Sequence, residues 1–247
     1  MSPRMVRVSP ALGPPKASQD PNFSAVSCAN IQMCLAVGSQ GYYLPLHSPV
    51  KSRPLTIGQY SQGVWHLRTL PNIRYWPTTA AELAGISCPG PSGCFAVGFT
   101  VTGQWSRTLV MHFNGVKWSV MHSPSPDASA SDLLSAIACP AVSECFAVGS
   151  TENRKLPLIE HFNGVSWSVV TLPTLAGSSR GQLLGVACPG VSQCYAVGVS
   201  SRRPLIGHYD GSMWRWIDLS ETVVRNNVSI RSTRSTRKVF LAFKQAR

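Results

Sequence analysis

Acidic residues are scarce in this chain of 247 residues. Asp and Glu together number 10, against 22 Lys and Arg, so the formal net charge is +12. The few carboxylates do not recur in pairs, as the acid and base of a glycosidase would. A phosphate-binding loop and the Asp-box of sialidases are missing as well. We therefore expect no catalytic residue and no cofactor, and the sequence favours a protein that is not an enzyme.

Long apolar runs and helical periodicity are also lacking. No segment has 18 consecutive apolar residues, which argues against a membrane span. No apolar stripe follows a period of 3.6 residues, so we expect almost no helix. Gly and Pro instead number 20 and 19, which is typical of short strands joined by turns. Residues 1–22 have no apolar core of the kind found in signal peptides, and we expect this segment to be disordered.

Cysteine occurs in one context only. A C-x5-C pair followed by Phe, Tyr or Leu and then Ala-Val-Gly appears four times with identical spacing. The first cysteines of successive copies lie 60, 51 and 49 residues apart, a period that indicates propeller blades or another solenoid unit. The pairs are Cys28 and Cys34, Cys88 and Cys94, Cys139 and Cys145, and Cys188 and Cys194.

A second block, ten residues long, follows each cysteine pair. It covers 109–118, 158–167 and 205–214, with a divergent version at 56–65. Its Asn-Gly or Asp-Gly pair predicts a hairpin because Gly tolerates a positive φ, and the flanking Val, Ile, Tyr and Trp favour strands. Each repeat therefore predicts four antiparallel strands, and the chain an all-β propeller with four visible blades. Four blades is the minimum for a closed propeller, so the four blades can also be part of a larger ring.

The predicted domain boundaries follow from these repeats. A four-bladed array covers 23–220, between the N-terminal segment 1–22 and a basic, disordered tail at 221–247. The tail has seven basic residues and one acid. Such a tail can serve as a nucleic-acid arm, but a solvated terminus is the simpler interpretation. We place the blades at about 23–71, 83–122, 133–173 and 183–220.

These residues resemble the Kelch-type blade of galactose-oxidase-like propellers. In that blade a glycine ends strand two, an aromatic residue lies on strand three and a tryptophan opens strand four. The matching residues are Gly98, Phe113 and Trp118; Gly149, Phe162 and Trp167; and Gly198, Tyr209 and Trp214. The chain departs from the Kelch pattern in having one glycine where two are common, and in its cysteines. The cysteine-paired form is similar to repeats of bacterial secreted proteins without assigned chemistry, so the resemblance implies binding or display.

Two roles fit the cysteine pairs. Strands joined by a five-residue turn bring each pair across a hairpin mouth, where a disulfide can close and stabilise by about 2 kcal/mol or less. Zinc is the alternative, but four such pairs on separate blades converge poorly on one ion. Disulfides imply an oxidising compartment, so we expect an extracellular or cell-envelope protein. A truncated or misassigned start, or another export route, would explain the missing signal peptide.

Histidine and tryptophan recur at fixed positions of the repeat. The histidines are His112, His161 and His208, with Gln59 in the first copy. Imidazoles on neighbouring blades are possible metal ligands, but equivalent strands lie far apart, which favours a structural hydrogen-bonding role and no metal. The tryptophans are Trp65, Trp118, Trp167 and Trp214, and we expect them to pack between blades.

Candidate binding residues lie in loops that differ between the repeats, because propellers bind ligands through blade-edge loops. The candidates are Trp105, Arg107, Arg154, Lys155, Arg202 and Arg203. They suit an anionic or glycan partner. We expect a monomeric, non-catalytic module that binds a protein or a cell-envelope polysaccharide and not nucleic acid. The alternative is part of a galactose-oxidase-like or lyase-like enzyme whose active residues lie outside this chain.

Overall fold

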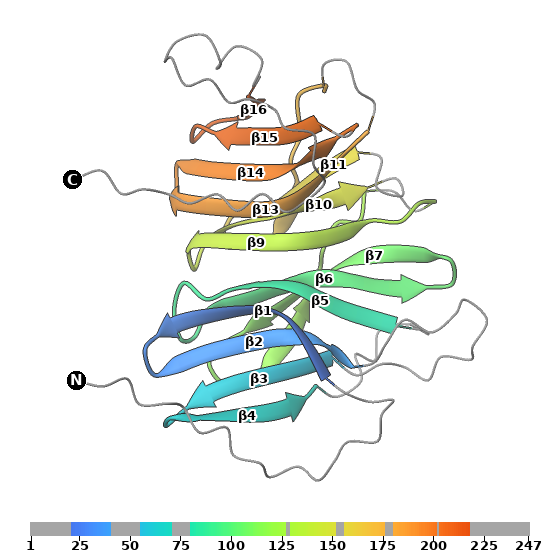
Figure 1. Cartoon of the computed structure of the whole chain (residues 1–247). Helices are drawn as coiled ribbons and strands as arrows, with labels where there is room; N and C mark the ends of the chain where they lie inside the picture. The colour runs from blue at the N-terminus through green and yellow to red at the C-terminus, as the bar shows by residue number, and fades with distance from the viewer. Residues whose placement is uncertain are drawn as a thin grey trace, which may run out of the picture. The chain divides into compact units, whose positions relative to one another are not determined.

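The computed structural model describes residues 21–40, 55–70, 80–126, 129–151, 156–175, 180–201 and 203–217. In these residues the chain is all-β, and the strands form four antiparallel sheets of four strands each. The strands of each sheet are neighbours in sequence order, as β1 to β4 show in Figure 1. The predicted all-β architecture of four-stranded antiparallel blades is confirmed. The described residues contain no helix of the length and apolarity that a membrane span requires.

We number the four sheets as blades 1 to 4. Blade 1 comprises β1 (Pro21–Asn30), β2 (Met33–Gln40), β3 (Leu55–Ser61) and β4 (Val64–Thr69). Blade 2 comprises β5 (Ala80–Ser87), β6 (Cys94–Thr102), β7 (Trp105–Phe113) and β8 (Trp118–Met121). Blade 3 comprises β9 (Leu133–Ala141), β10 (Glu144–Thr151), β11 (Leu156–Phe162) and β12 (Trp167–Val169). Blade 4 comprises β13 (Gly181–Gly190), β14 (Gln193–Ser200), β15 (Arg203–Tyr209) and β16 (Trp214–Trp216).

Each blade has one disulfide between its first two strands. The bonds are Cys28–Cys34, Cys88–Cys94, Cys139–Cys145 and Cys188–Cys194, with Cα atoms 3.9 to 4.1 Å apart. These are the pairs that the spacing favours, and no cysteine is left free to ligate zinc. In blade 4 the strands continue past the disulfide, so the turn is shorter than the five residues expected between the cysteines and covers only 191–192.

An Asx side chain closes the hairpin between strands three and four in blades 2 to 4. Oδ1 of Asn114 accepts hydrogen bonds from the amides two and three residues further on, at 3.0 and 2.9 Å. Asn163 and Asp210 accept the same pair of bonds in their blades. The glycines that follow have φ of 92, 89 and 93°, as the Asn-Gly pattern predicts. Blade 1 instead places both Gln62 and Gly63 at positive φ.

The glycine of Ala-Val-Gly lies where strand one makes a close approach to strand two. In blade 3 a register shift in β9 falls opposite Gly149. A Cβ atom on Gly149 would overlap the carbonyl oxygen of Leu133. The equivalent glycines, Gly38, Gly98 and Gly198, would meet the carbonyl oxygens of Asn22, Glu82 and Gln182 in the same way. The motif therefore needs glycine for steric reasons, and not for a positive φ.

Consecutive blades pack through three apolar clusters. The first cluster joins blades 1 and 2, the second blades 2 and 3, and the third blades 3 and 4. In the second, the ring centroid of Phe95 in blade 2 lies 5.1 Å from that of Phe162 and 6.2 Å from that of Trp167, both in blade 3. In the described part of the chain no cluster joins blade 4 to blade 1, so no closed ring is seen there.

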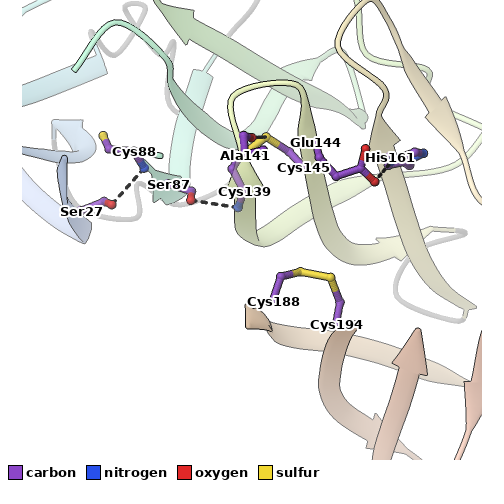
Figure 2. The surroundings of a disulfide bond; sticks show 10 residues. All are labelled: Ser27, Ser87, Cys88, Cys139, Ala141, Glu144, Cys145, His161, Cys188 and Cys194. Atoms are coloured by element: carbon purple, nitrogen blue, oxygen red, sulfur yellow. Dashed lines mark hydrogen bonds and ion pairs between the residues drawn. A yellow bond between two sulfur atoms is a disulfide. The ribbon is translucent and has the colours of Figure 1, made fainter. Parts of the chain in front are cut away.

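Hydrogen bonds between first strands add to two of these contacts. Oγ of Ser27 in blade 1 accepts a bond from the amide of Cys88 in blade 2, at 3.0 Å. Oγ of Ser87 accepts a bond from the amide of Cys139 in blade 3, also at 3.0 Å. Figure 2 shows both bonds, the second beside the Cys139–Cys145 disulfide. The equivalent residue in blade 3 is Ala138, which has no hydroxyl. Blade 4 is therefore held to blade 3 without this bond.

Candidate functional site

The two edges of each blade differ in how they are built. At one edge the cysteine turn and the Asx turn of a blade lie together: a Cβ on Gly164 would be 3.0 Å from Cβ of Ser143, and one on Gly211 would be 3.0 Å from Cβ of Ser192. We call this the turn edge. Because antiparallel strands alternate in direction, the links between strands two and three and between blades leave from the opposite edge, which we call the loop edge. Its described parts are 70, 103–104, 122–126, 129–132, 170–175, 180, 201 and 217.

Three of the predicted binding residues lie at the loop edge. Trp105 and Arg107 are the first and third residues of β7, directly after the hairpin, and Arg203 is the first residue of β15. Arg107 and Arg203 occupy equivalent repeat positions, each two residues before a buried leucine. The other candidates, Arg154, Lys155 and Arg202, lie outside the described residues. The structure thus places two arginines at the same edge of blades 2 and 4.

The guanidinium of Arg107 also has a structural role. Its Nη1 donates to the carbonyl oxygens of Ser106, at 3.1 Å, and of Ala130, at 2.6 Å. Since Ala130 is in the link between blades 2 and 3, Arg107 fixes that link against β7. Arg203 is exposed, as is expected of a residue that meets a partner. A ligand-binding role for these residues stays a prediction.

A buried carboxyl group lies beneath the loop edge between blades 2 and 3. The side chain of Glu160, in β11, is fully buried. Its Oε2 accepts a hydrogen bond of 2.8 Å from the hydroxyl of Ser123, which lies 2.7 Å from Oγ1 of Thr108. Oγ1 of Thr108 is in turn 3.0 Å from Oγ of Ser125. This chain of hydroxyls joins blade 2, the following link and blade 3.

Burial changes the protonation of Glu160. Loss of solvent raises its pKa to about 7, and the charge of Asp132 acts in the same direction, while the hydroxyls of Ser123 and Thr108 lower it. Its Oε1 has no hydrogen-bond partner among the described residues. Glu160 stands where the other blades have Met111, Gly207 and Gly58. That difference is the only signal in the sequence for this buried group, and it does not by itself reveal the hydroxyls.

The stability of the protein is expected to decrease as the pH rises from about 4.5 to about 7. The carboxyl of Glu160 keeps its proton over this range in the folded chain and loses it in the unfolded chain, so the folded state binds more protons and is favoured at the acid end. At pH 8 the ionised carboxyl lowers the free energy of unfolding by about 3 kcal/mol. Glu160→Gln removes this ionisation. The difference in free energy of unfolding between the variant and the wild type, measured in urea, is therefore expected to shift in favour of the variant by about 1 to 3 kcal/mol from pH 4.5 to pH 8.

A matched control is Glu82→Gln. Glu82 lies in β5 and is partly exposed. This substitution is not expected to reproduce the gain. If Glu160→Gln and the wild type change in parallel over this pH range, Glu160 does not titrate as described.

The recurrent histidines share a contact with an aromatic ring. Each lies opposite an aromatic residue of strand two in the same blade: His112 on Phe95, His161 on Phe146 and His208 on Tyr195, with ring centroids 4.6 to 4.7 Å apart. In blade 1 the same cross-strand pair is Leu35 and Gln59, so both partners change together. Hydrogen bonding, which we expected, is seen between His161 and Glu144. It is not seen for Nε2 of His208, which is buried without a partner among the described residues. The described residues contain no group of three or more His, Cys, Asp or Glu able to hold a metal ion.

Most of the recurrent tryptophans lie between blades, as predicted. Trp118 packs against the first cluster, and Trp167 and Trp214 belong to the second and third. Trp65 differs, because no described blade precedes blade 1. Its side chain contacts Tyr60 of the same blade, with ring centroids 5.6 Å apart. The prediction of inter-blade packing is therefore wrong for Trp65.

Comparison of the whole chain with known proteins adds no information about the loop edge. No family model matches the chain, and no curated protein matches it.

Proposed function

We propose that this protein is a non-catalytic, exported module that binds a protein or a cell-envelope polysaccharide through its loop edge. The four disulfides are typical of extracellular proteins, which supports export. The Kelch-like character of the repeats is part of the same proposal. The alternative, a galactose-oxidase-like or lyase-like enzyme, stays a prediction that no feature of the described residues favours.

The observation that carries the proposal is the difference between the two edges. A disulfide closes the turn edge in every blade, and an Asx turn adds to it in blades 2 to 4. At the loop edge, length and composition vary between the blades. Arg203 is exposed there, and Trp105 is half-buried beside its hairpin. Guanidinium groups bind carboxylates and phosphates with paired hydrogen bonds, and an indole ring offers an apolar face with a polar tip. Of the two partner classes, a polysaccharide with acidic groups fits these side chains best.

Binding to acidic polysaccharides is expected to depend on Arg203 and Trp105. A panel of acidic and neutral polysaccharides is screened first, and the dissociation constant of the best acidic ligand is then measured by calorimetry. Arg203→Gln and Trp105→Ala are each expected to raise it by about tenfold, since each removes about 1.4 kcal/mol or more of contact energy.

The matched control is Arg215→Gln. Arg215 is exposed, but it lies beside the turn edge, where its Nη1 is 2.6 Å from Oδ2 of Asp210. It is expected to leave the dissociation constant unchanged. Equal losses in Arg203→Gln and Arg215→Gln, with none in Trp105→Ala, would indicate attraction by net charge alone. No loss in Arg203→Gln or Trp105→Ala would remove the loop edge as the binding surface.

A further inference from the structure

The two end blades expose residues that the interior blades bury at the same repeat positions. In blade 4 the side chain of Tyr195 is 40% exposed, whereas its equivalents Phe95 and Phe146 are 2% and 1% exposed. Val197 is 46% exposed, against 0% for both Val97 and Val148. The residues are apolar at all these positions. What differs is that blades 2 and 3 are followed by another described blade and blade 4 is not.

Blade 1 shows the complementary exposure on its other face. Phe23 is 49% exposed, whereas its equivalents Leu83 and Leu183 are 0% exposed. Trp65 is 38% exposed, against 2% for Trp214 of blade 4. Phe23 and Trp65 lie together, since both would touch a Cβ placed on Gly58, at 3.1 and 3.3 Å. They form an apolar patch on the side of blade 1 that receives no other described blade.

The contacts between consecutive blades show which side chain packs on the equivalent surface of an interior blade. Between blades 3 and 4, the ring of Phe146 lies 4.9 Å from that of Tyr209 and 5.6 Å from that of Trp214. One blade thus donates a strand-two ring, and the next supplies an aromatic pair from strands three and four. Phe95 makes the same contact with the pair in blade 3. In blade 4 the strand-two ring of Tyr195 has no described blade to receive it. In blade 1 the aromatic pair Tyr60 and Trp65 receives no ring from a described blade.

We infer that blade 4 of one molecule docks on blade 1 of a second copy of this chain, with Tyr195 against Tyr60 and Trp65. Both halves of the interface are present on one chain, and their geometry repeats contacts already made between its own blades. No described cluster joins the two halves within one chain, which favours a second copy over internal closure. Tyrosine at position 195, where the interior blades 2 and 3 have Phe95 and Phe146, suits a surface that is wet in the free chain and buried in the complex. The protein is then not the monomer that its sequence suggests.

The contact is head to tail, because different surfaces of the two molecules meet. Such an interface closes into a ring or continues as a filament. Two copies supply eight blades, which is within the four to eight that closed propellers use. A closed dimer therefore satisfies both ends at once.

The test uses variants of the full-length chain at the two ends. Tyr195→Arg and Trp65→Arg each place a charge in the apolar interface. Wild type is expected to sediment as a dimer or larger oligomer at micromolar concentration. Each variant alone is expected to sediment as a monomer, with a dissociation constant raised about a hundredfold or more, as for central interface residues. Val120→Arg is the matched control, since Val120 is 40% exposed but lies on an interior blade; it is expected to remain oligomeric.

Mixing the two variants gives the sharpest result. Trp65→Arg keeps an intact blade 4 and Tyr195→Arg keeps an intact blade 1, so one good contact can form between them. The mixture is expected to give a 1:1 heterodimer, which also shows that both variants are folded. A wild type that is monomeric at all concentrations, or variants whose mixture stays monomeric although each has the wild-type circular dichroism spectrum, would overturn the inference.

Discussion

Replacing Gly149 by alanine is expected to destabilise the protein by about 4 kcal/mol or more. The added Cβ would overlap the carbonyl oxygen of Leu133, which is backbone and not the end of a flexible side chain. The next residue, Leu134, is fully buried in the cluster between blades 2 and 3. Strand β9 can therefore move away only by disturbing a close-packed core, and changes of this kind give the largest losses known for single substitutions.

The measurement is the free energy of unfolding in urea, and Gly190→Ala is the control. A Cβ on Gly190, at the end of β13, would have no neighbour within 4 Å. Its substitution is expected to change stability by less than about 0.5 kcal/mol. Equal effects of the two substitutions would mean that strand one does not approach the Ala-Val-Gly glycine as closely as described.

Local chemistry explains why much of the fold is predictable from the sequence. The five residues between cysteines fix a hairpin, so Cys28 and Cys34 are direct cross-strand partners. Asn114 and Gly115 fix a turn through an Asx bond and a positive φ. Both signals depend on residues a few positions apart. Repetition then gives the number of blades without any knowledge of how they pack.

Features that depend on contacts between distant residues are not predictable in this way. The Ala-Val-Gly glycine is recognisable as part of a repeat, but its reason is a register shift in strand one that no residue type signals. Glu160 is visible as an exception to the repeat, yet the hydroxyls of Ser123 and Thr108 approach it only because blades 2 and 3 pack together. The same holds for Trp65, whose equivalents are covered by a neighbouring blade.

The candidate binding surface is predictable in position but not in detail. Variable loops pointed to the loop edge, and Arg203 is exposed there. The bond from Arg107 to the carbonyl of Ala130 could not be foreseen, because it joins two segments 23 residues apart. A basic residue in a variable loop is thus a ligand candidate only after its protein contacts are known.

A blade buries the strand-two side chain of the blade before it, so one repeat position is core in blade 2 and surface in blade 4. The decisive test compares Phe95→Ala with Tyr195→Ala by urea unfolding, at a protein concentration where the chain is monomeric. Phe95→Ala is expected to lower the free energy of unfolding by about 3 to 5 kcal/mol, because it leaves a cavity between Phe162 and Trp167. Tyr195→Ala is expected to lower it by less than about 1 kcal/mol, because the ring of Tyr195 is 40% exposed. Similar losses for the two variants would contradict the packing of the blades described above.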